Sequence, residues 1–180
     1  MPTRYPPLTR VPHMLHGGDY NPDQWLYDPQ VLKDDLRLMR EAGVNVVSLG
    51  VFAWAALEPE EGHYTFGWLD RVMDDLCGNG VYVALATPSG AKPAWMSDKY
   101  PEIRRVSADG VREPHRGRHN HCRTSPIYRA KCAEIIQRQL AELGIRVKIR
   151  IVEWAAFVTD FINKRRFDAT ILGWTIPMDP

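Results

Sequence analysis

Three tryptophans are the residues of this sequence best suited to hold a ligand by stacking. Trp25, Trp54 and Trp95 each lie shortly after a segment whose composition predicts a β-strand. The face of an indole ring packs well against the apolar face of a sugar, so all three are candidate carbohydrate contacts. The sequence leaves an alternative open, because Trp54 and Trp95 could equally pack beneath their own loops.

A basic stretch is the second concentration of functional side chains, and it consists of Arg112, His115, Arg116, Arg118, His119, His121 and Arg123. The stretch lacks interleaved aromatic residues and a recognisable nucleic-acid-binding fold. The whole chain carries a net charge of only +1, which provides no long-range field to attract nucleic acid or an anionic membrane. We therefore predict no nucleic-acid partner.

The cysteine spacing argues against a metal site. The chain has three cysteines, and no two of them form a CxxC pair. His119 and His121 precede Cys122, but a closed zinc site needs four nitrogen or sulfur ligands. We predict no metal site and no cofactor.

Alternating strands and helices must position these side chains. Element order and hydrophobic patterning together predict strands over residues 16–20, 44–52, 81–87, 146–153 and 168–174, and helices over residues 30–41, 66–77, 124–143 and 155–166. Strict alternation favours right-handed crossovers and a parallel sheet. The prediction is an α/β fold with five parallel strands, arranged either as half of a (β/α)8 barrel or as an open twisted sheet.

The sequences of the strands predict different degrees of burial for their two faces. The second and third are continuous apolar runs, which are typical of strands covered on both faces. The fourth alternates strictly, so that Arg146, Lys148 and Arg150 share one face that must reach water. Exposed sheet edges beside such a strand favour self-association.

We expect a single α/β domain over residues 15–180, preceded by a proline-rich tail over residues 1–14. The N-terminus lacks the apolar run of a signal peptide, and no segment approaches the roughly 20 apolar residues of a membrane span. These features predict a cytoplasmic protein without a membrane partner. Ser125, Pro126 and Gly144 supply the start and stop signals of the long helix over residues 124–143.

Four sequence blocks together resemble the N-terminal part of family 42 glycoside hydrolases, the retaining β-galactosidases. They are HGGDYNPDQW at 16–25, the stretch 45–66, ATPSGAKPAW at 86–95 and GRHNHCRTSPIYR at 117–129. The resemblance covers about residues 13–131 and implies the first three βα units of a (β/α)8 barrel, with the site on the loops after the strands. It also implies that Arg118 and Asn120 lie in the sugar-anchoring loop.

The resemblance does not supply a catalytic pair. Retaining hydrolysis uses two carboxyl groups about 5 to 5.5 Å apart, yet the family's Asn-Glu motif, which carries the general acid, occurs nowhere in the sequence. Glu153 closes the fourth strand where that acid would fall, but Val152 replaces the asparagine. We therefore assign no catalytic residue and predict Glu153 as a sugar contact. Cys122 matches a zinc cysteine of many family members, but its partners are missing.

About residues 133–180 resemble an internal piece of family 5 extracellular solute-binding proteins, through the strand GIRVKI, the turn RRFD and the run LGWTIPMDP, and we expect residues 132–180 to form a βαβ unit. The sequence thus predicts a chimeric or artificially generated, non-catalytic protein with at most weak affinity for a β-galactoside sugar. One alternative is a truncated β-galactosidase-like hydrolase completed by oligomerisation. Another is a small binding module unrelated to either parent.

Overall fold

The computed structural model describes residues 11, 13–116, 121–150, 152 and 154–164. The chain divides into two compact units, Met1–Val147 and Lys148–Pro180. The first unit contains the sheet and its helices. The predicted single domain over residues 15–180 stays a prediction.

The sheet of the first unit is parallel and has the strand order β1-β2-β3. Its strands are β1 Gly17–Tyr20, β2 Val46–Leu49 and β3 Tyr82–Leu85. In the register, Val46 is the partner of Gly17 on one side and of Tyr82 on the other. The strands follow one another in chain order, so successive right-handed crossovers place the connecting helices on one face of the sheet.

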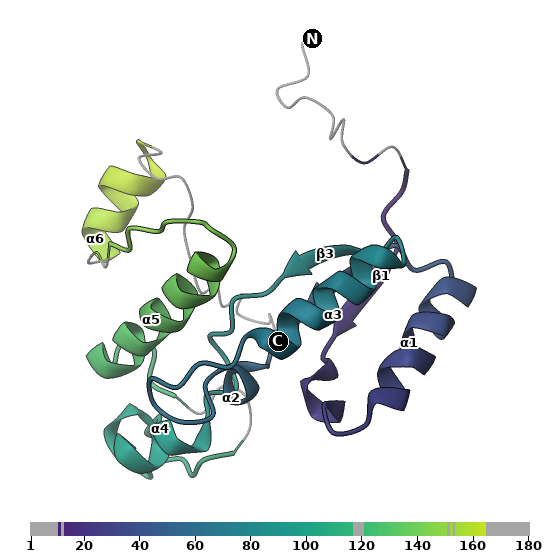
Figure 1. The fold of residues 1–180 in the computed structure, drawn as a ribbon. Helices are drawn as coiled ribbons and strands as arrows, with labels where there is room; N and C mark the ends of the chain where they lie inside the picture. Colours follow the sequence, from purple (N-terminus) through teal and green to yellow (C-terminus); the bar gives the residue numbers. More distant parts are fainter. Residues whose placement is uncertain (1–10, 12, 117–120, 151, 153, 165–180) are drawn as a thin grey trace, which may run out of the picture. The chain divides into compact units, whose positions relative to one another are not determined.

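Two connections join the strands. The first contains the 3₁₀ helix η1 Pro22–Trp25 and the helix α1 Pro29–Glu41. The second contains the short helix α2 Trp54–Leu57 and the longer helix α3 Gly67–Gly78. Figure 1 shows α3 running in front of the strands.

The core lies between the sheet and these helices. Val47 and Leu49 of β2 are buried in one cluster with Leu69, Val72 and Leu76 of α3. Their neighbours in the strands point to the other face, which is why burial alternates along β2 and β3.

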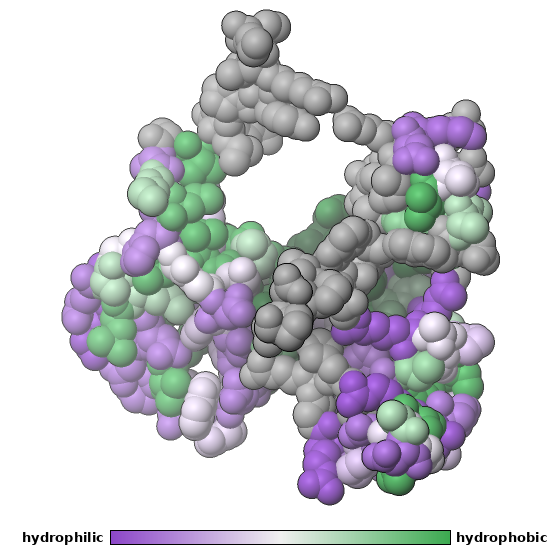
Figure 2. All heavy atoms as spheres, turned by 180° about the vertical axis from the view of Figure 1, so that it is seen from behind, coloured by the Kyte–Doolittle hydropathy of each residue, from purple (hydrophilic) through white to green (hydrophobic). Residues whose placement is uncertain are grey.

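The prediction that β2 and β3 are covered on both faces is wrong for the described residues. Tyr82 and Ala84 of β3 are exposed, and Ser48 of β2 is only partly buried. The helices cover one face only, so the apolar residues on the opposite face reach solvent. In the view from behind, hydrophobic residues lie at the surface among hydrophilic ones (Figure 2).

Gly17 permits the close approach of β1 to β2. A Cβ atom at Gly17 would lie 1.7 Å from the carbonyl oxygen of Val46, whereas one at Gly18 would meet nothing within 4 Å. Only glycine fits at the first of these positions, because even one extra carbon would collide with the backbone of the neighbouring strand.

A long segment after β3 contains α4 Ala94–Lys99 and η2 Pro101–Ile103, and it leads to α5 Pro126–Glu142. The predicted long helix is confirmed: Ser125 is the N-cap, and its Oγ accepts a hydrogen bond from the Tyr128 backbone N–H at 3.4 Å. Gly144 follows the helix with a φ of 72°, a conformation that favours glycine.

The prediction of five strands is wrong for the described part of the chain, which forms three. Residues 146–150 carry no strand. Arg146, Lys148 and Arg150 are exposed there, since these charged side chains must stay in water. The predicted fifth strand, over residues 168–174, lies outside the described residues.

The second unit contains α6 Trp154–Ala156 and the π-helical segment η3 Phe157–Ile162. The predicted helix over residues 155–166 is therefore helical over 155–162, mostly with the wider π-type winding, and residues 163–164 form a turn. The Thr159 hydroxyl donates to the Ala155 carbonyl at 2.8 Å, a local bond that competes with the backbone ladder.

Candidate functional site at the carboxyl ends of the strands

The carboxyl ends of the three strands form a common edge. The backbone N–H of Gly50 donates to the Tyr20 carbonyl at 3.0 Å, and that of Ala86 donates to the Leu49 carbonyl at 3.0 Å. The chain then leaves β2 through Gly50, whose φ of 74° is readily adopted only by glycine. The segments that follow the strands, over 21–28, 50–66 and 86–100, therefore start side by side.

Glu58 links two of the three predicted tryptophans. Its side chain is 1% exposed, and its Oε2 accepts from the Trp54 indole N–H at 2.9 Å. Its backbone carbonyl accepts from the Trp95 indole N–H, also at 2.9 Å. Gly62 closes the loop by donating its backbone N–H to Oε1 at 3.0 Å.

The three tryptophans are consequently in different environments. Trp54 is fully buried and packs against Tyr128, with ring centroids 6.2 Å apart. Trp95 on α4 is partly buried. Trp25 on η1 is 47% exposed and lies near Tyr27. The structure thus brings Trp54 and Trp95 together through Glu58 and places Trp25 on a different segment.

The other predicted sugar contacts, Arg118, Asn120 and Glu153, lie outside the described residues. Their assignment stays a prediction. The segments on either side of the basic loop are described, and they contain a polar cluster that packs on α4.

That cluster pairs a serine with a histidine. Ser97 of α4 lies 2.8 Å, Oγ to Nδ1, from His115. Burial lowers the pKa of His115, and the nearby Lys92 ammonium lowers it further. Lys92 is itself buried, which lowers its pKa, and the charge of Arg104 adds to the effect. Lys92 and Arg104 therefore lie close to His115, and the Asp98 carboxylate opposes their effect on its pKa.

Glu61 connects the loop after β2 to α4 and α5. It forms ion pairs with Lys99 and, at 2.9 Å, with Lys131. Tyr100 donates its hydroxyl to Oε1 at 2.8 Å. Hydrogen bonds from Lys99, Lys131 and Tyr100 lower the pKa of Glu61 from 4.5 to about 2.

Lys131 extends this network. Its ammonium also contacts Glu134 at 3.0 Å, and Glu134 accepts from the Tyr64 hydroxyl at 2.9 Å. Each of the two carboxylates therefore binds at least two donors. The network fixes the positions of the loops that surround the strand ends.

Sequence reasoning missed two polar oxygens that directly follow β1. Among the described residues, Oδ1 of Asn21 and Oδ1 of Asp23 are buried and have no hydrogen-bond partner. Burial raises the pKa of Asp23. The turn signal Asn21-Pro22 was visible in the sequence, but burial of the flanking oxygens depends on tertiary packing. Buried acceptors without a hydrogen-bond partner are rare in folded proteins.

Metal ligands do not cluster in the described residues: no three His, Cys, Asp or Glu side chains there could hold a metal ion. Cys122 instead lies 3.0 Å, Sγ to Oγ1, from Thr124. This contact lowers the pKa of the thiol.

The sequence model of glycoside hydrolase family 42, described as beta-galactosidase, matches residues 19–154. The chain belongs to glycoside hydrolase family 42. The match is continuous across the predicted junction near residues 131–133, so the comparisons give no support to a chimera or to a solute-binding fragment.

Curated relatives show the same likeness. The chain is 62% identical over 137 residues to beta-galactosidase BglY of Alicyclobacillus acidocaldarius, a match that covers 76% of this chain and 20% of the relative. It is 57% identical over 129 residues to beta-galactosidase GanA of Bacillus subtilis, covering 72% of this chain and 19% of the relative. The chain therefore spans about one fifth of the length of the relatives it matches.

The fold is similar to solved structures of the family. The beta-galactosidase of Rahnella sp. R3 superposes with a TM-score of 0.70 at 55% identity, over 75% of this chain and 20% of that protein. The fold class is thus α/β with a parallel sheet, similar to the N-terminal region of the family's barrel.

Proposed function

We propose that the chain acts in β-galactoside hydrolysis as the first three βα units of a family 42 barrel, and that its strand ends form one wall of the sugar site. The observation that carries the proposal is the aligned edge of the three strands, with the buried Glu58 fixing the loops above it. Family membership supplies the substrate class.

The wall supplies binding groups. Arg118 and Asn120 hold sugar hydroxyls, and the guanidinium of arginine offers several donors in a fixed geometry. Trp95 can stack against the sugar with its partly exposed ring. Trp54 is fully buried, so it supports the loop above it and does not touch the sugar.

Bond cleavage needs more than this wall. A retaining mechanism requires a nucleophile and an acid held about 5 to 5.5 Å apart, and we assign neither role to a residue of this chain. Glu153 is proposed as a sugar contact. The chain then binds β-galactosides weakly, and it contributes to turnover only within a complete barrel, whether this forms by self-association or with further polypeptide.

We place the protein in the cytoplasm.

The binding test uses methyl β-D-galactopyranoside and saturation-transfer NMR on the purified chain. We expect a dissociation constant of about 1 mM or weaker, which corresponds to roughly −4 kcal/mol. Arg118→Ala should weaken binding about tenfold, because it removes hydrogen bonds from a charged donor. Arg116→Ala is the matched control, since Arg116 is an exposed arginine of the same loop.

Two results would overturn the proposal. One is the absence of saturation transfer to the galactoside. The other is an equal loss of binding in Arg116→Ala and Arg118→Ala. A chromogenic β-galactoside tests the assignment of catalysis: turnover by the chain alone that disappears in Glu153→Gln would make Glu153 the catalytic acid and contradict its proposed role as a contact.

A further inference from the structure

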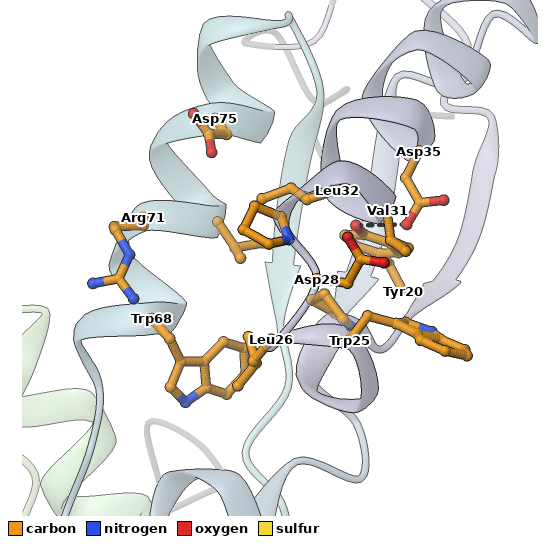
Figure 3. Close-up of a pocket in the computed structure, with 13 residues that line it drawn as sticks. Tyr20, Trp25, Leu26, Asp28, Val31, Leu32, Asp35, Trp68, Arg71 and Asp75 are labelled. Carbon is orange, nitrogen blue, oxygen red and sulfur yellow. Dashed lines mark hydrogen bonds between the residues drawn. The ribbon is translucent and has the colours of Figure 1, made fainter.

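A pocket of about 190 Å³ opens between α1 and α3 (Figure 3). The residues that matter for its chemistry are Trp25, Asp28, Asp35, Trp68, Arg71 and Asp75. Sites for drug-sized ligands have volumes of roughly 300–1,000 Å³. The pocket is therefore sized for a ligand of about one ring.

Its floor is apolar. Leu32 of α1 and Val72 of α3 line it together with the indole of Trp68. The Trp68 indole N–H is already bonded to the Ala56 carbonyl at 3.2 Å, so this ring offers only its apolar surface. Trp25 lies at the edge of the pocket, and 47% of it is exposed. An apolar face of a ligand can thus rest between the two helices.

The rim is charged, with three carboxylates and one guanidinium. Figure 3 shows Arg71 and Asp75 on the α3 side, and Asp28 and Asp35 on the α1 side. Three carboxylates against one cation repel an anionic ligand such as phosphate. A ligand that is only a cation offers no acceptor to the Arg71 guanidinium.

Two of the carboxylates already have a partner within the protein. Asp28 Oδ1 accepts from the Gln30 backbone N–H at 3.0 Å, and Asp35 Oδ2 accepts from the Tyr20 hydroxyl at 3.0 Å. Their remaining lone pairs can accept from hydroxyl donors. A ligand that both donates to carboxylates and accepts from a guanidinium satisfies the whole rim.

We propose that this pocket binds one ring of a neutral sugar. The apolar face of the ring lies on Leu32, Val72 and Trp68, while its hydroxyls donate to Asp28 and Asp75 and accept from Arg71. The segment 21–28 contributes residues both to this pocket and to the strand-end wall, but the pocket does not depend on the function proposed for that wall. It would hold a saccharide unit on the helical side of the sheet.

The test follows the indole N–H resonances of Trp25 and Trp68 by ¹H–¹⁵N NMR while D-galactose is added to the purified chain. We expect both resonances to shift with one common dissociation constant. Arg71→Met should weaken this binding at least about fivefold, because it removes the donor at the rim. The matched control is Arg129→Met, since both arginines are exposed and lie on helices. Arg129 is remote in sequence and does not line the pocket.

Several results would contradict the proposal. The two indole resonances could fail to shift, or Arg71→Met and Arg129→Met could behave alike. Larger shifts of the same resonances with benzylammonium or with inorganic phosphate would assign the pocket to a cation or to an anion instead. If the strand-end wall does not bind the sugar, Arg118→Ala and Arg116→Ala will bind the galactoside equally well. The titration of the Trp25 and Trp68 indole resonances will be unchanged, so the two proposals can be tested apart.

Discussion

Glu58 is a carboxylate in the interior of the protein, and each of its oxygens accepts a hydrogen bond. The donors are the Trp54 indole and the Gly62 backbone. A buried donor that loses its acceptor retains its full desolvation cost. Glu58 therefore determines both the stability of the loop after β2 and the placement of Trp54.

Glu58→Ala should destabilise the protein by about 1–3 kcal/mol, because it leaves the Trp54 indole N–H unpaired in the core. Urea denaturation measures the change as a shift of the unfolding midpoint. Glu60→Ala is the control: Glu60 is exposed, and its removal should change stability by less than about 0.5 kcal/mol. Equal effects of the two substitutions would show that Glu58 does not support the loop.

Glu61 should make stability depend on acidic pH. Its pKa falls from 4.5 to about 2 in the folded protein, so folding favours the charged carboxylate. This contribution is complete above about pH 4.5 and is lost as the pH falls towards 2. Unfolding midpoints measured across this range should fall more steeply for the wild type than for Glu61→Gln. If the unfolding midpoints of the wild type and of Glu61→Gln changed equally with pH, the ion pairs of Glu61 would not be the cause of the pH dependence.

At the scale of elements, the sequence predicted what local chemistry determines. The start of α5 followed from Ser125 and Pro126, and the strands β2 and β3 from their apolar runs. What escaped prediction depends on distant contacts. The apolar run over residues 81–87 gave no indication that Tyr82 would be exposed, because cover on the second face must come from other elements.

The same reasoning applies to the site. Tryptophans after strands could be identified from spacing alone, but spacing cannot distinguish the buried Trp54 from the exposed Trp25. Glu58 lies four residues after Trp54, a helical spacing that brings two side chains together. This signal was available in the sequence. The pocket near Trp25 was not predictable, since it depends on the packing of α1 beside α3.

Pairing of β1 with β2 should depend on Gly17. Gly17→Ala should destabilise the protein by about 3 kcal/mol or more, because its Cβ would collide with the Val46 carbonyl. Gly18→Ala is the matched control, with open space around the new methyl group. Hydrogen exchange of the Gly50 amide, which donates to Tyr20, reports on this pairing. Unchanged protection in Gly17→Ala would contradict the register.

At the scale of the whole molecule, the chain matches family 42 β-galactosidases over about three quarters of its own length and one fifth of theirs. The sheet is covered by helices on one face, and its other face exposes residues such as Tyr82. Among the described residues, no helix is long and apolar enough to cross a membrane. The function that we propose depends on the carboxyl ends of the three strands.

The most direct measurement is a map of backbone amide shifts on addition of methyl β-D-galactopyranoside, with methyl α-D-glucopyranoside as the comparison sugar. The account predicts that the galactoside shifts amides over residues 50–53 and 86–95, at the carboxyl ends of β2 and β3, more strongly than the glucoside does. Shifts that are absent from both segments, or equal for the two sugars, would contradict it.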